Sequence, residues 1–136
     1  MSDLKNDAQA KHMLDAFASH CGIELQELSQ EQCVLTVRLC PEHLNLYGFV
    51  HGGMIHTIMD NAGGILASYA HGEPRPVVTA CADAHFLYPV RGASMRAVAT
   101  LVKGGHTMAR VQLGVFDEAG KLCCAGLNEY VYTDQS

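Results

Sequence analysis

A glycine-rich loop followed by one carboxylate is the part of this chain best suited to chemistry. Residues 43–53 read His-Leu-Asn-Leu-Tyr-Gly-Phe-Val-His-Gly-Gly, and a helix-like stretch that carries Asp60 follows. The first N–H groups of a helix have no partner inside it and lie at its positive end, so they stabilise an oxygen that becomes negative during a reaction. Asp60 is the only acidic residue between Glu42 and Glu73. This arrangement predicts a hydrolytic site.

The helix predicted over residues 52–70 has two different faces. Apolar residues at helical spacing form a core-facing stripe, which comprises Ile55, Ile58, Met59, Ala62, Ile65, Leu66 and Tyr69. The opposite face is small apart from one carboxylate and comprises Gly53, Thr57, Asp60, Gly64 and Ala67. Gly63 and Gly64 should each cost roughly 1 kcal/mol relative to alanine inside a helix. We therefore expect another backbone or a ligand to approach this helix closely.

The elements around this helix are predicted to be a leading helix over residues 3–20 and six strands. The strands are expected at residues 22–29, 31–40, 77–88, 93–103, 106–116 and 121–132. The short connections between the last four strands predict antiparallel neighbours. One helix covers a sheet of this size best when the sheet curls around it. The predicted class is α+β, with a long central helix wrapped by a curved antiparallel sheet of five to six strands.

The bulk composition sets the class of protein. A length of 136 residues predicts one domain over 1–136, and the net charge of −5 argues against a nucleic-acid partner. No apolar segment approaches the roughly 20 residues that span a bilayer, and the polar N-terminus does not resemble a signal peptide. A cytoplasmic protein with no membrane partner is therefore expected. The six cysteines contain no C-x-x-C pair, which predicts reduced thiols and no metal site.

The loop and the carboxylate together resemble a family signature. Asn45, Gly48, His51-Gly52-Gly53 and Asp60 have the spacing found in hotdog-fold acyl-CoA thioesterases. The pattern is most similar to the PaaI-like group, which comprises the phenylacetic acid degradation and thioesterase superfamily member 2 types. The order of the predicted elements also fits the hotdog fold, so the resemblance covers nearly the whole chain.

The resemblance implies a role for each residue of the motif. Asp60 would be the general base or the nucleophile that acts on the thioester carbonyl, and the Gly52 N–H would be the oxyanion donor. Asn45 would orient the nucleophilic water or hold the carbonyl. His51 would shape the loop and hydrogen-bond the thioester. Thr79 falls where some relatives carry a serine that helps to position water.

The spacing of two of these residues bears on the assembly. Gly52 and Asp60 are eight residues apart, hence about 12 Å along a helix axis. The donor and the base must each lie roughly 3 Å from the reacting atoms, so one subunit alone does not bring both to one carbonyl. A homodimer in which Gly52 of one chain faces Asp60 of the other satisfies the geometry and makes two equal sites. The family also implies a homotetramer built as a dimer of dimers.

The substrate implied by the resemblance is an acyl-CoA, with coenzyme A as part of the substrate and no separate cofactor. The predicted substrate-binding residues include the loop glycines Gly48 and Gly53. The acyl group would contact Tyr47 and Met59, together with Phe49, Met54 and Phe86. The phosphates of coenzyme A would be held by cations near strand ends. Those candidates are Arg91, Lys103 and His106, with Arg96 and Arg110 nearby.

Three other functions fit parts of the pattern. An enoyl-CoA hydratase or dehydratase would need an Asp–His pair, but Ile65 stands five residues beyond Asp60. A non-catalytic acyl-CoA sensor or scaffold would tend to lose the carboxylate, which this chain retains. A thioesterase acting on acyl carrier protein is the third alternative, which the acidic net charge mildly disfavours. The sequence does not specify the acyl group.

Overall fold

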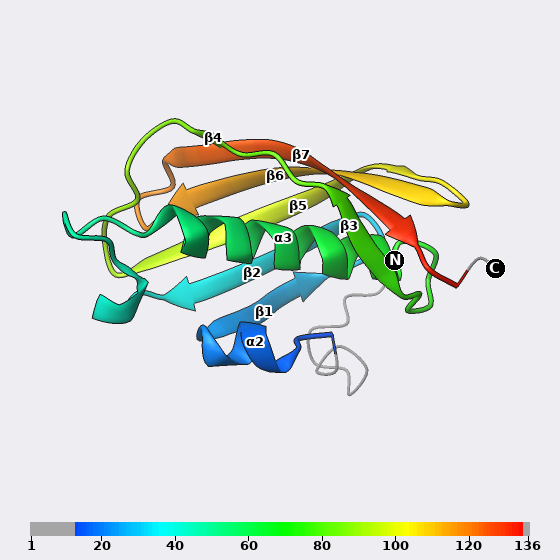
Figure 1. Ribbon diagram of the computed structural model, residues 1–136, viewed down its shortest axis with the longest axis horizontal. Coiled ribbons are helices and arrows are strands. Elements are labelled where there is room, and N and C mark those ends of the chain that lie inside the picture. Colours follow the sequence, from blue (N-terminus) through cyan, green and yellow to red (C-terminus); the bar gives the residue numbers. More distant parts are fainter. Residues whose placement is uncertain (1–12, 135–136) are drawn as a thin grey trace.

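The computed structural model describes residues 13–134 and contains one long helix against one antiparallel sheet (Figure 1). A short helix, α2 (Ala16–His20), precedes the strands β1 (Ile23–Leu28) and β2 (Gln32–Arg38). A 3₁₀ turn, η1 (Pro41–His43), leads to the long helix α3 (Gly52–Tyr69). Five strands follow: β3 (Val77–Cys81), β4 (His85–Phe86), β5 (Ser94–Gly104), β6 (Met108–Asp117) and β7 (Leu122–Tyr132). The predicted leading helix is described only in part, since residues 1–12 lie outside the described range.

The sheet has the order β1-β2-β5-β6-β7-β3, with β4 also pairing with β7, and every pairing is antiparallel. It curves around α3, which lies along one face of it (Figure 1). Strand β6 shows why one face of the sheet packs against α3, because its buried residues alternate with more exposed ones. Ala109, Val111, Leu113 and Val115 point into the core, while Arg110 and Gln112 face outward. The expected α+β class and hotdog fold are confirmed.

One predicted strand is divided into two. The segment over residues 77–88 forms β3 and the two-residue β4, so the sheet has seven strands instead of five or six. Asp83 lies at the interruption, where its carboxylate accepts a hydrogen bond of 2.6 Å from the N–H of Leu127 on β7. The Asp83 carboxylate therefore takes the place of a backbone carbonyl in the hydrogen bonding between the strands, and the backbone leaves the sheet there. Aspartate side chains often compete in this way with backbone hydrogen bonds.

The core fills the space between α3 and the sheet. Every residue of the predicted helix stripe is buried, and the largest buried side chains include Tyr130 and Tyr132 of β7. One residue assigned to the opposite face is wrongly placed, since Ala67 is fully buried and its carbonyl accepts a hydrogen bond from Tyr132. In the part of the chain that the structure describes, no helix is long and apolar enough to cross a membrane.

Candidate active site

The start of α3 leaves one backbone donor free. His51, with φ −60° and ψ 135°, caps the helix: its Nδ1 accepts the Gly53 N–H at 2.8 Å, and its carbonyl accepts from Met54 and Ile55 at 2.9 and 3.2 Å. Within residues 13–134, the Gly52 N–H has no hydrogen-bond partner. The positive end of the helix thus offers one N–H to an external acceptor.

The loop before α3 is held in shape by its own side chains. Asn45 Oδ1 accepts the N–H groups of Tyr47 and Phe49 at 2.9 and 3.2 Å, and Gly48 has a φ of +83°, which glycine adopts without strain. His43 is buried and donates from Nε2 to the Cys21 carbonyl at 2.7 Å. The Asn45 oxygen is therefore occupied inside the loop, and only its Nδ2 group is available for another partner.

Asp60 projects from the middle of α3, and its carboxylate is hydrogen-bonded through one oxygen. Thr79 Oγ1 of β3 donates to Asp60 Oδ1 at 2.9 Å, and Tyr130 Oη of β7 donates to the same oxygen at 3.0 Å. No described residue bonds to Asp60 Oδ2. The carboxylate is fixed in direction by two strands and keeps one free oxygen, as a base or nucleophile requires.

Asp60 lines a cleft of about 810 Å³ between α3, α2 and the start of β3. Thr57 and Gly64 of α3 line it on either side of Asp60, and Asp15 and Phe17 line it from the α2 side. Thr79 and Tyr130 also reach it, so the motif carboxylate and both of its partners share one cavity. Gly52 lies elsewhere, at the helix start, where the Phe86 ring lies 3.7 Å from the position a Cβ would take.

Tyr130 is a site residue that sequence reasoning missed. Burial raises the pKa of its phenol well above the ordinary value, so the group stays protonated and donates its hydrogen. The available signal was the glycine pair in α3: a Cβ on Gly63 would collide with the Tyr130 hydroxyl. The expected close approach to this helix is therefore made by a tyrosine side chain.

This packing gives a stability prediction. We expect Gly63→Ala to lower the free energy of unfolding by about 1–3 kcal/mol, because the new methyl overlaps the buried Tyr130 ring. Gly64→Ala is the matched control, since its Cβ would lie 3.6 Å from Tyr130 in ordinary contact. Gly64→Ala should be neutral or stabilise the protein by up to about 1 kcal/mol, because alanine is the better helix former. Urea unfolding of both variants measures their free energies of unfolding. Equal values for Gly63→Ala and Gly64→Ala would contradict the packing described.

The predicted substrate-binding residues do not all reach the cleft. Met59 is 1% exposed and packs in the core, where its sulfur lies 3.6 Å from Cys124, so it does not line the cleft. Tyr47 is exposed on the loop before α3 and borders a separate hollow with Asn45 and His51. The Arg91 guanidinium lies 4.8 Å from the centre of the Phe49 ring.

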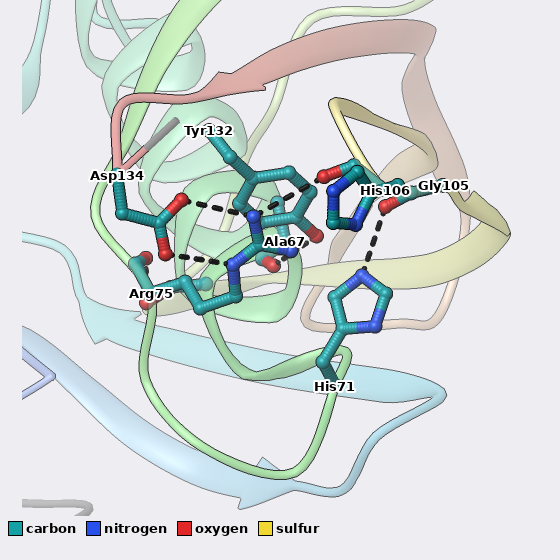
Figure 2. A network of polar contacts seen from close by, with 8 residues as sticks. Ala67, His71, Arg75, Gly105, His106, Tyr132 and Asp134 are labelled. Carbon is teal, nitrogen blue, oxygen red and sulfur yellow. Dashed lines mark hydrogen bonds and ion pairs between the residues drawn. The ribbon is translucent and has the colours of Figure 1, made fainter. Parts of the chain in front are cut away.

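The backbone of one predicted phosphate contact, His106, takes part in a polar network around Arg75 (Figure 2). Arg110 is paired instead with Glu129 at 2.7 Å. Arg75 lines the cleft and donates to both carboxylate oxygens of Asp134 at 2.9 Å and to the His106 carbonyl at 3.1 Å. Its guanidinium also lies 3.8 Å from the centre of the Tyr132 ring. The side chains of His106 and Lys103, which lie close together in the sequence, are both exposed. Arg75 is held by these contacts and connects the start of β3 to the end of β7.

Comparison with known proteins gives a consistent picture. The thioesterase superfamily model matches residues 47–124, which is more than half of the chain and includes Gly52 and Asp60. A Haemophilus influenzae protein whose name places it only in the general class of esterases is 28% identical over 106 residues, covering 78% of this chain and 77% of that protein.

Solved structures agree with this match. A crystal structure of a Haemophilus influenzae thioesterase aligns with a TM-score of 0.82 and 25% identity, over 89% of this chain and 85% of that one. The Escherichia coli PaaI protein from the phenylacetic acid degradation operon aligns with a TM-score of 0.83 and 19% identity, over 93% and 91% of the two chains. At this level of identity, the similarity to the Escherichia coli protein shows a shared fold.

Proposed function

The chain belongs to the thioesterase superfamily, and we propose that it hydrolyses acyl-CoA thioesters to a free carboxylic acid and coenzyme A. The observation that carries this proposal is the carboxylate of Asp60, which is held through Oδ1 and keeps Oδ2 free in the cleft. The Gly52 N–H at the start of the same helix, which has no partner among the described residues, supplies the second requirement, a donor for a developing oxyanion. Thioester hydrolysis needs little beyond these two groups, because the thiolate is a good leaving group.

The reaction begins at the acyl carbon. With Asp60 as general base, Oδ2 takes a proton from water while the water oxygen bonds to the acyl carbon, and the carbonyl oxygen becomes negative against the Gly52 N–H. The carbonyl then re-forms as the C–S bond breaks, and the thiolate takes the proton. With Asp60 as nucleophile, Oδ2 itself bonds to the acyl carbon, the thiolate leaves, and water hydrolyses the resulting anhydride. Both routes convert one thioester and one water into one acid and one thiol.

We propose that each site is shared between two subunits. Gly52 and Asp60 lie on one continuous helix, and eight residues of helix correspond to about 12 Å. That separation supports a two-fold homodimer in which Gly52 of one chain and Asp60 of its partner face the same carbonyl. The position of β3 at the edge of the described sheet fits an assembly of this kind, since an edge strand offers unpaired backbone groups. A homotetramer built from two such dimers is the larger assembly expected.

The remaining motif residues take supporting roles in this proposal. His51 keeps the helix start open by capping Gly53, which leaves the Gly52 N–H for substrate. Thr79 holds Asp60 and keeps hydroxyl lone pairs that can accept from the attacking water. The Asn45 Nδ2 group is the part of that side chain able to contact water or the carbonyl. Arg91, Lys103 and His106 are exposed and are proposed to meet the phosphates of coenzyme A.

A panel of acyl-CoA thioesters tests the proposed function. The panel should span short, medium and long chains together with benzoyl, hydroxybenzoyl and phenylacetyl groups. Hydrolysis is best followed by loss of thioester absorbance, because the six cysteines would react with a thiol reagent. Turnover of any member supports the proposal and identifies the acyl class. Binding without turnover would favour an acyl-CoA sensor, and turnover of acyl carrier protein thioesters alone would change the substrate.

A further inference from the structure

A chain of hydrogen bonds runs from the interruption in the sheet to Asp60. The Asp83 N–H donates to Asn128 Oδ1 at 3.2 Å, and Asn128 Nδ2 donates to Tyr130 Oη at 2.9 Å. Tyr130 Oη then donates its one hydrogen to Asp60, where Oδ1 at 3.0 Å and the backbone carbonyl oxygen at 3.1 Å share it as acceptors. Asn128 and Tyr130 are each 1% exposed. The two side chains in the middle of this chain of hydrogen bonds are therefore buried.

The direction of each bond in this chain is fixed. A backbone N–H only donates, so the Asn128 group that faces Asp83 is its oxygen and the group that faces Tyr130 is its NH₂. With that NH₂ donating to the phenol oxygen, the phenol hydrogen is directed to Asp60. Burial raises the pKa of Tyr130 well above the ordinary value, so this hydrogen is retained. The orientation of the hydroxyl is thus set by the backbone at Asp83.

We infer that Tyr130 and Asn128 are positioning residues that make Oδ2 the reacting oxygen of Asp60. Thr79 and Tyr130 both bond to Oδ1, so the two oxygens of this carboxylate are not equivalent. The bond from the buried phenol stabilises the ionised carboxylate and fixes its plane. This inference rests on the proposed function for its catalytic consequence, while the hydrogen-bond chain itself is measurable without turnover.

Other ionisable groups near Asp60 do not make the same contact. His56 lies one turn before it on α3, Asp15 lines the cleft at the start of α2, and Arg75 also lines the cleft. Among the described residues, none of these three is hydrogen-bonded to the Asp60 carboxylate. The groups that hold the carboxylate are the two hydroxyls, and of these only the phenol is buried.

Tyr130→Phe removes one hydroxyl and tests the inference, with Tyr132→Phe as its matched control. Tyr132 is 2% exposed, lies two residues along the same strand, and donates to the Ala67 carbonyl on the same helix at 2.8 Å. Both variants lose one buried phenol hydroxyl bonded to α3. Only Tyr130→Phe removes a bond to Asp60.

The expected result is a loss of kcat with little change in KM. Because the carboxylate loses a donor that fixes its plane, kcat should fall about tenfold in Tyr130→Phe. Tyr132→Phe should leave kcat near the wild-type value. Asn128→Leu should lower kcat by a smaller amount, and should have no further effect when added to Tyr130→Phe, since its influence passes through the hydroxyl.

A second measurement keeps this inference separate from the proposed function. The ¹³C chemical shift of the Asp60 carboxyl carbon, compared at one pH, should change in Tyr130→Phe and stay in place in Tyr132→Phe, whether or not the protein turns over any thioester. An unchanged kcat together with an unchanged chemical shift in Tyr130→Phe would overturn the inference. An inactive wild type with the NMR shift present would refute the acyl-CoA proposal and leave the hydrogen-bond chain established.

Discussion

Replacing Asp60 with asparagine is expected to lower kcat/KM for the best acyl-CoA substrate by about 10²–10⁴-fold, the range that a positioned base contributes. The amide has nearly the same shape, and its oxygen can still accept from Thr79 and Tyr130 as Oδ1 does now. The variant should therefore fold like the wild type. What it lacks is an oxygen able to take a proton from water or to attack the acyl carbon. Absorbance assays with the panel measure the loss.

Asp15→Asn is the matched control for this prediction. Asp15 also lines the cleft, and it caps α2 by accepting the Ala18 N–H at 2.9 Å. Asparagine caps a helix about as well as aspartate, so this variant removes a second carboxylate from the same cleft at little structural cost. It should keep activity near that of the wild type. An Asp60→Asn protein that stays folded and remains as active as the Asp15→Asn protein would remove Asp60 from the mechanism.

Gly52→Pro should lower kcat by about 10²–10³-fold, which is the cost of losing one oxyanion donor. Proline is well tolerated at the first position of a helix, where its missing N–H has no helical partner. It also restricts the preceding residue to extended backbone, and His51 already has φ −60° and ψ 135°. The substitution thus removes the proposed donor with little cost to the helix.

Gly52→Ala is the control that retains the donor. Its Cβ would lie 3.7 Å from the Phe86 ring, an ordinary contact, so the alanine variant should keep most of the wild-type kcat. Circular dichroism and thermal unfolding establish that both variants are folded. If proline and alanine reduced kcat equally, the effect would belong to the missing flexibility or to the contact with Phe86, and the N–H would have no role as a donor.

Much of the fold could be predicted from the sequence because its elements are strongly periodic. The apolar stripe from Ile55 to Tyr69 recurs at helical spacing and is buried in the structure. Strands β5 and β6 alternate between inward and outward residues, and short turns join β5 to β6 and β6 to β7, so these two antiparallel pairings are confirmed. The expected pairing of the run over 77–88 with the run that follows it is wrong, since β3 and β4 both pair with β7 while β5 pairs with β2 and β6. The break at Asp83 did not follow, because it depends on a bond to Leu127 that lies far away in sequence.

The candidate site was predictable only where its residues are close in sequence. The motif from Asn45 to Asp60 is local, and its loop and helix appear at the expected places. Tyr130 was missed because its contact with Asp60 spans 70 residues and depends on how β7 packs against α3. The expected contact between Met59 and the acyl group is not borne out in the cleft, because Met59 belongs to the apolar stripe and neighbouring residues on a helix point about 100° apart. That rotation turns Met59 into the core.

The most direct test of the central claim is complementation between two inactive variants. Asp60→Asn and Gly52→Pro chains should be produced together in equal amounts, and the mixed oligomers compared with each variant alone. If each site takes Gly52 from one subunit and Asp60 from its partner, about one quarter of the sites in a random mixture are intact, and activity should return to about a quarter of the wild-type value. A mixture no more active than its better parent would contradict the shared site and place the chemistry within one chain.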